Sequence, residues 1–179
     1  MRGSILAVGF AAFALVTGVA SAGTTQRELP IEQAVVQRIN EVRAEHGLRP
    51  LALSSSLTAA AAQHSESMAD LGYFTHESHD GTVFWQRIGQ FYGTRGYTGW
   101  SVGENIVFGS EPLSADDVVQ AWLDSPPHRR NLLSPAWREI GVGVVSATGA
   151  PGVFGGDDIL LATADFGVRH SSRRVPKQK

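Results

Sequence analysis

Apolar residues in the first half of the chain recur three and four positions apart, which is the spacing of an amphipathic helix. One such stripe lies between Pro30 and Gly47 and consists of Ile31, Val35, Ile39 and Val42. A second lies between the serines at 54–56 and Gly72 and consists of Leu57, Ala61, His64, Met68 and Leu71. The pattern predicts a helix over residues 31–46 and another that begins at the serine cluster and ends before Gly72.

Shorter elements follow in the second half of the chain. We expect a short helix around 83–88, a long loop rich in Gly and aromatic residues over 89–103, and a helix from Ser114 to about Asp124 that Pro126-Pro127 ends. Ser114 and Asp117 have the spacing of a capping box. Apolar alternation predicts strands over 140–145 and 159–166. Helices first and strands last indicate an α+β domain, with helices packed over a small antiparallel sheet.

The first 22 residues have the pattern of a secretory signal peptide. Arg2 precedes an apolar run over 5–19, and Ala20-Ser21-Ala22 suits cleavage before Gly23. The alternative, a permanent anchor, is less favoured because the run is short for a bilayer span. We therefore expect a secreted, extracellular protein without a transmembrane segment after cleavage. The chain has no Cys, so its stability must come from its core rather than from disulfides.

The rest of the chain divides into one domain, residues 23–168, and a basic tail, residues 169–179. The domain holds nine Arg, no Lys and all 17 Asp and Glu, a formal charge of −8. This acidic composition, with few aromatic–basic clusters, argues against nucleic acid as the partner. The tail could contact anionic polymers or lipid, but its composition favours a solvated, disordered end. We expect the protein to be a monomer.

The stretch F-T-H-E-S-H-D-G-T, residues 74–82, contains two histidines close together. A zinc-protease helix needs H-E-x-x-H, which places both imidazoles on one helix face. Here the spacing is H-E-S-H, one residue short, and turn-forming residues surround it. If His76 or His79 binds a ligand, the other groups of that site must come from elsewhere in the chain.

Three segments together resemble the bacterial branch of the CAP superfamily, named for cysteine-rich secretory proteins, antigen 5 and pathogenesis-related proteins. They are F-T-H at 74–76, G-E-N-I at 103–106 and the block A-W-L-D-S-P-P-H-R-R-N-L-L-S-P-A-W-R-E-I-G-V-G at 121–143. The likeness covers roughly residues 31–166. It implies a three-layer α-β-α sandwich with a central cleft.

In that family a His-Glu-Glu-His group lines the cleft and binds a divalent metal in some members. The resemblance assigns the first His to His76, the first Glu to Glu104 and the last His to His128. The remaining Glu belongs to a W-x-x-E pattern, and Ser125 stands in its place here. This departure leaves Ser125 and its neighbour Asp124 as candidates for a supporting role behind the ligands.

His76, Glu104 and His128 would suit zinc with an open fourth position, where a bound water becomes more acidic. Another divalent metal, such as copper or nickel, or a metal-free polar network held by Glu104 is the alternative. His64, on its apolar stripe, is expected to be a hydrogen-bonded core or boundary residue, and His79 to face solvent. Asn105 is expected to bond the backbone of its own loop.

Three function classes stay open at this point. The first is a binding module whose cleft holds a divalent metal or a small polar ligand. The second is a metal-assisted hydrolase of peptides or esters, with His76, Glu104 and His128 as its catalytic candidates. The third is a scaffold that docks lipid or an extracellular protein on an aromatic loop, although core packing is the favoured role of that loop. Its aromatic residues are Phe91, Tyr92, Tyr97 and Trp100.

One competing motif is G-W-S-V-G at 99–103, which matches the G-x-S-x-G nucleophile elbow of serine hydrolases. Asp165 and His170 would complete a triad in the right chain order. The elbow needs a strand before it and a helix after it, whereas a strand-like run follows here. A Gly-rich loop that supplies Glu104 to the cleft is therefore the favoured interpretation.

Overall fold

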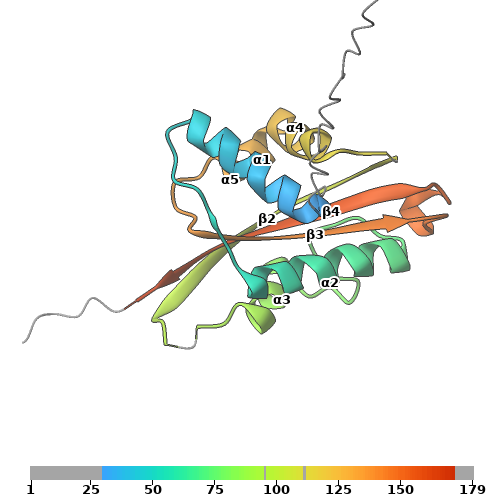
Figure 1. Ribbon diagram of the computed structural model, residues 1–179. Helices are drawn as coiled ribbons and strands as arrows, with labels where there is room; N and C mark the ends of the chain where they lie inside the picture. The colour runs from blue at the N-terminus through green and yellow to red at the C-terminus, as the bar shows by residue number, and fades with distance from the viewer. Residues whose placement is uncertain (1–29, 95, 111, 172–179) are drawn as a thin grey trace, which may run out of the picture.

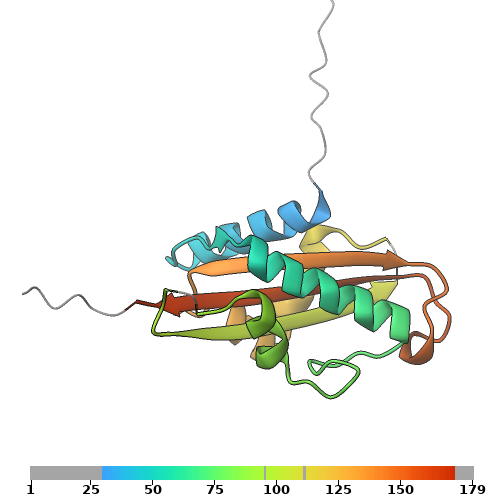
Figure 2. The same cartoon turned by 90° about the horizontal axis from the view of Figure 1, so that it is seen from below.

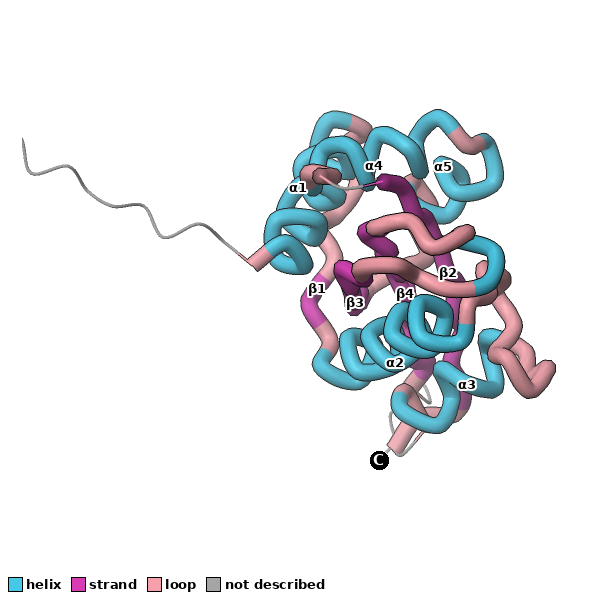
Figure 3. Tube along the Cα trace, turned by 90° about the vertical axis from the view of Figure 1, so that its right-hand side faces the viewer, coloured by secondary structure: helices cyan, strands magenta, loops and turns pink. Residues whose placement is uncertain are grey.

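The computed structural model describes residues 30–94, 96–110 and 112–171. Figures 1 and 3 show three layers, with a central sheet between two groups of helices. One face carries α1 (Ile31–Glu45), α4 (Ala115–Asp124) and α5 (Pro126–Leu132). The other face carries α2 (Ser55–Leu71) and α3 (Phe84–Phe91), and Figure 2 shows α2 crossing the strands. The expected α+β class and α-β-α sandwich are confirmed.

Within the described residues the sheet has four strands, in the order β1-β3-β4-β2. Their bounds are Ala52–Leu53, Gly99–Ser110, Glu139–Ala147 and Ile159–His170 for β1 to β4. β4 pairs antiparallel with both β2 and β3, but β1 pairs parallel with β3. The pairing of β2, β3 and β4 is antiparallel, as expected from the sequence, and the two-residue β1 adds a parallel pair that was not expected, so the sheet is mixed. At two residues, β1 is too short to show a hydrophobic period in the sequence.

Two glycines let α2 lie directly on β3. A Cβ at Gly141 would lie 2.0 Å from the backbone nitrogen of Thr58, and one at Gly143 would lie 2.2 Å from that of Ala62. The alternating apolar residues of β3, Ile140 and Val142, belong to the core that α1 and α4 cover on the opposite face. The Gly/apolar alternation thus fixes which face of the strand each helix layer contacts.

The predicted helix boundaries are confirmed by their caps. The Ser54 side chain accepts from the backbone N–H of Leu57, and Gly72 ends α2 in the left-handed conformation at φ 70°. Ser114 and Asp117 form the predicted capping box at the start of α4. The side chains of Ser54 and Ser114 and the backbone N–H of Gly72 thus satisfy backbone groups that a helix end leaves free.

Two expectations for the irregular segments were wrong, and a third, that Pro126-Pro127 ends a helix, was confirmed but incomplete. The loop predicted over 89–103 is short, because α3 continues to Phe91 and β2 begins at Gly99. Pro126-Pro127 does follow the end of α4, but it also opens α5, since proline is tolerated in the first helical turn. Arg169 and His170 belong to β4, paired with Trp100 and Gly99, rather than to a tail.

The expected signal peptide and residues 172–179 of the expected tail lie outside the described residues. Within the described part of the chain, no helix is both long and apolar enough to span a membrane.

Candidate functional site

Glu104 is a buried carboxylate at the centre of a polar cluster. Its side chain is 1% exposed, and each oxygen accepts one strong hydrogen bond. His76 Nδ1 lies 2.8 Å from Oε1, and Arg87 Nη2 lies 2.5 Å from Oε2. Because a carboxylate only accepts, Nδ1 of His76 carries the proton, and in the neutral ring Nε2 is left as the lone-pair nitrogen.

Neighbouring residues of β2 point to opposite sides of the strand and serve different elements. Glu104 is turned towards Arg87 of α3, whereas Asn105 is turned towards α5. The buried Asn105 amide donates to the backbone carbonyl of His128 (3.1 Å) and accepts from the Asn131 amide (3.0 Å). Asn105 therefore fixes α5 and the backbone of His128, which corrects the expectation that it serves its own loop.

A cleft of about 440 Å³ opens beside these residues. Its lining comes from the loop after α2, from β2, and from α5 with the segment that follows it: His76, Glu104, Asn105, Pro127, His128, Arg130, Asn131, Ser134 and Trp137. The ring centroids of His76 and His128 are 6.3 Å apart. The structure thus brings together the three residues that the sequence assigned to one site.

Burial and the local charges set the protonation of the cluster. Burial alone raises the pKa of Glu104, but the His76 hydrogen bond and the Arg87 charge outweigh it, and the pKa lies below its usual value. Burial lowers the pKa of His64 to about 4, partly opposed by the nearby Glu104. The pKa of His128 is lowered by burial and then by His76. At neutral pH the cleft therefore presents an ionised Glu104 and a neutral His128.

The two residues expected to support the ligands lie outside the cleft lining. Asp124 is exposed, and one of its carboxylate oxygens accepts from the Gln120 amide at 2.8 Å. Ser125 lies at the junction of α4 and α5, where its backbone carbonyl accepts from the N–H of Arg129. Neither Asp124 nor Ser125 is among the residues that line the cleft.

His64 and His79 take the positions expected of them. His64 is 1% exposed, and its Nε2 lies 3.0 Å from the carbonyl of Thr75. It is the predicted core histidine, yet it also lies 4.0 Å from Glu104. His79 is exposed, as predicted, and packs against the ring of Tyr73.

The G-x-S-x-G segment is not a nucleophile elbow. Residues 99–103 form the first part of the extended strand β2, so the required strand-to-helix turn does not occur at Ser101. Asp165 faces Glu104 in the strand register and is fully buried, while Ser101 and His170 are exposed partners 3.4 Å apart. The three residues therefore do not form a catalytic triad.

Most of the aromatic segment belongs to the core. Tyr92 is fully buried, its hydroxyl donates to Glu139, and Arg169 lies over its ring at 3.9 Å. Trp100 is half-buried and packs against the cluster of Leu57 and Tyr92. Tyr97 remains exposed, at 42%. The segment therefore serves packing, as favoured from the sequence.

Sequence reasoning missed Arg87, the cation that balances Glu104. It lies on α3 and is only 4% exposed, although Arg is among the residues least often buried. The sequence offers one weak signal, which is that Arg87 directly precedes Ile88, a core residue of the same short helix.

The described side chains of the cleft offer two imidazoles to a metal ion rather than a full set of ligands. Among the residues that the structure describes, no three His, Cys, Asp or Glu side chains are grouped to hold a metal ion. Both oxygens of Glu104 are already engaged, by a histidine and by a guanidinium. The imidazoles of His76 and His128 are close enough to face one small cation, with Glu104 behind His76.

Comparison with known proteins places this fold and cleft in a family. The cysteine-rich secretory protein family, CAP, matches residues 36–155. The chain is 34% identical over 116 residues to the protein YkwD of Bacillus subtilis, a match that covers 65% of this chain and 43% of YkwD. It is 30% identical over 114 residues to the Bacillus subtilis membrane protein YlbC, covering 63% of this chain and 31% of YlbC. The chain thus spans less than half the length of these relatives.

Solved structures show the same fold. An extracellular protein of Bacillus anthracis that contains an SCP domain superposes with a TM-score of 0.58 at 29% identity, covering 75% of this chain and 39% of that protein. An outer surface protein of Borrelia burgdorferi superposes with a TM-score of 0.61 at 24% identity, covering 76% of this chain and 91% of that protein. With the match to residues 36–155, these findings show that the chain belongs to the cysteine-rich secretory protein (CAP) family.

Proposed function

We propose that the protein is an extracellular binding module whose cleft holds a divalent cation, such as zinc, between the imidazoles of His76 and His128. The observation that carries this proposal is the 2.8 Å contact between His76 Nδ1 and Glu104. Histidines that bind metals characteristically donate their other ring N–H to a carboxylate, which fixes the tautomer and the ring orientation. In this proposal Glu104 orients His76 and does not itself coordinate the ion.

Arg87 explains why Glu104 stays in that position. Its guanidinium holds the second carboxylate oxygen and neutralises the buried charge, so the carboxylate can face His76 without a solvent contact. Asn105 fixes the other half of the site through the backbone of His128. Two neighbouring residues of β2 therefore hold the two halves of the site: Glu104 orients the ring of His76, and Asn105 holds the backbone of His128.

The cleft beside this pair can receive a small polar ligand. A bound cation would supply open coordination positions for the oxygen atoms of such a ligand. Arg130 lines the same cleft, and its charge favours a ligand that carries an acidic group. The extracellular location rests on the signal-peptide pattern of residues 1–22 and on the extracellular Bacillus anthracis relative.

Calorimetric titration of zinc into the metal-stripped protein tests the proposal. We expect one-site binding that falls by at least about tenfold in His128→Ala and by about 10- to 100-fold in Glu104→Gln. His79→Ala is the matched control, because His79 is an exposed histidine that is not part of the cleft lining. Equal zinc binding by the wild type and His128→Ala would contradict the proposal.

A further inference from the structure

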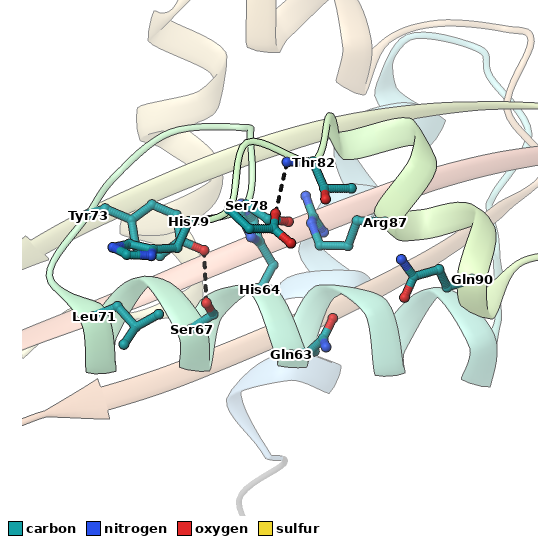
Figure 4. Close-up of a pocket in the computed structure, with 11 residues that line it drawn as sticks. Gln63, His64, Ser67, Leu71, Tyr73, Ser78, His79, Thr82, Arg87 and Gln90 are labelled. Atoms are coloured by element: carbon teal, nitrogen blue, oxygen red, sulfur yellow. Dashed lines mark hydrogen bonds between the residues drawn. The ribbon is translucent and has the colours of Figure 1, made fainter.

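A second pocket lies on the side of the molecule that carries α2 and α3, separate from the lining of the cleft. It has a volume of about 330 Å³ and lies between α2, the loop that follows α2, and α3. Figure 4 shows side chains from all three segments turned towards the same space. His76, Glu104 and His128 are not among its lining residues, so its ligand would not be the ligand of the cleft.

Two buried polar side chains line this pocket with unused hydrogen-bonding atoms. Arg87 uses Nη2 for Glu104 and for the carbonyl of His76, but no described residue offers a partner to its Nε or Nη1. His64 Nε2 bonds to a carbonyl, so Nε2 carries the proton and Nδ1 is an acceptor. Nδ1 likewise has no partner in the described part of the chain. The pocket therefore has both free donors and a free acceptor beside it.

Such atoms need partners. Leaving a buried polar group unsatisfied costs about 1–3 kcal/mol, and native proteins rarely do so. His64 and Arg87 are 1% and 4% exposed, so bulk solvent does not reach them freely. A molecule that hydrogen-bonds to these atoms from the pocket, whether water or a ligand, would supply an acceptor for Arg87 and a donor for His64.

The charges around the pocket exclude a simple anion as the best ligand. Glu104 already balances the charge of Arg87. Among the lining residues that the structure describes, the other one with a fixed charge is Asp80, a carboxylate, and an anion would also face the lone pair of His64 Nδ1. A neutral ligand avoids both repulsions.

The rim of the pocket matches a ligand with many hydroxyl groups. Gln63 and Gln90 bring amides from α2 and α3, and Ser78 and Thr82 bring hydroxyls from the loop. Amides and hydroxyls both donate and accept, as a sugar hydroxyl does. Tyr73 adds an aromatic ring at one end, where Figure 4 shows it beside His79.

We infer that this pocket binds a neutral saccharide unit, with its hydroxyls reaching Arg87 and His64 and its edges held by the two glutamines. A hydroxyl group satisfies the free donors and the free acceptor at once, which neither an anion nor an ammonium group does. The inference does not depend on the proposed cation, because the two sites have different lining residues and are tested with different probes.

Nuclear magnetic resonance of the ¹⁵N-labelled protein tests this inference. The probes are glucose, galactose, mannose, N-acetylglucosamine and N-acetylgalactosamine, each titrated separately, with sodium sulfate as the anionic comparison. We expect at least one sugar to move the side-chain amide signals of Gln63 and Gln90 and the backbone signals of 78–82, while sulfate leaves them in place. The double variant Gln63→Ala/Gln90→Ala should bind that sugar at least fivefold more weakly.

Both glutamines lie at the rim of the pocket rather than in the core, so the double variant is expected to fold, and Gln86→Ala on the exposed part of α3 is the matched control. Three outcomes would overturn the inference. If sulfate moves these signals and no sugar does, the pocket is an anion site. If neither sulfate nor any of the five sugars moves them, water alone satisfies Arg87 and His64. If a sugar binds equally well to the double variant, it binds elsewhere.

Discussion

Glu104 and Asp165 stand directly opposite each other in the register of β2 and β4. Glu104 accepts from His76 and Arg87, whereas neither oxygen of Asp165 has a hydrogen-bond partner among the described residues. Two adjacent buried carboxylates cannot both ionise without a large cost. Burial raises the pKa of Asp165 well above its usual value and the charge of Glu104 raises it further, so Glu104 is the partner that ionises.

Asp165→Asn should become more stable relative to the wild type as the pH rises. The folded state binds the proton of Asp165 more tightly than the unfolded chain, so this group contributes stability at low pH that is lost as the pH rises through the folded pKa. Asn has nearly the same shape and does not titrate. Urea unfolding of both proteins at pH 5 and pH 8 measures the difference. A difference that is the same at both pH values would show that Asp165 ionises normally.

Protonation of His64 should lower the free energy of unfolding as the pH falls from 6.5 to 4. Its folded pKa of about 4 lies below the unfolded value of 6.5, so its contribution is complete above pH 6.5 and is lost as the pH falls to 4. Between pH 7 and pH 4.5 the wild type should lose roughly 2–3 kcal/mol more than His64→Gln, which does not titrate. Parallel losses in the two proteins, measured by urea unfolding, would show that His64 is accessible to protons in the folded state.

Adding one methyl group to β3 should strongly destabilise the fold. In Gly143→Ala the new Cβ would meet the backbone of α2 at 2.2 Å, so the helix must shift, at a cost of about 3 kcal/mol. Gly99→Ala in β2 is the control, because its Cβ would meet only the His170 ring at 3.9 Å. Thermal unfolding of both variants measures the effect. Similar melting temperatures would mean that α2 does not lie against β3 as described.

Asn105→Ala should destabilise the protein and weaken zinc binding together. The substitution leaves the carbonyl of His128 and the amide of Asn131 without their partner, which costs about 2 kcal/mol. It also removes the hydrogen bonds that hold α5 against β2 beside the cleft. Gln120→Ala, which removes an exposed amide from α4, should change neither property. Loss of stability with unchanged zinc affinity would show that Asn105 does not contribute to zinc binding.

The sequence predicted the regular elements well because their signals are local. The stripe of α1, the caps at Ser54 and Ser114, and the alternation of β3 each depend on a few neighbouring residues. β1 and α5 were missed because two residues show no period and because a Pro-Pro pair can both follow one helix and open the next.

The site, too, could be predicted from the sequence only in part. His76, Glu104 and His128 were found through motif resemblance, and the structure brings them together. Arg87 was missed because its role depends on contacts between α3 and β2, which no spacing in the sequence reveals. The sequence offered Glu104 either as a metal ligand or as the residue that holds a polar network by bonding a histidine. Without Arg87 it could not show that both oxygens of Glu104 are engaged.

The most direct test of the central claim is a long-range ¹H–¹⁵N spectrum of the histidine rings, recorded with and without zinc. We predict that His76 is protonated at Nδ1 before zinc is added, because that nitrogen donates to Glu104. On saturation, Nε2 of His76 and one ring nitrogen of His128 should shift, while the nitrogens of His79 stay in place. Unchanged spectra of His76 and His128 at saturating zinc, or a His76 ring protonated at Nε2, would contradict the proposed two-histidine site.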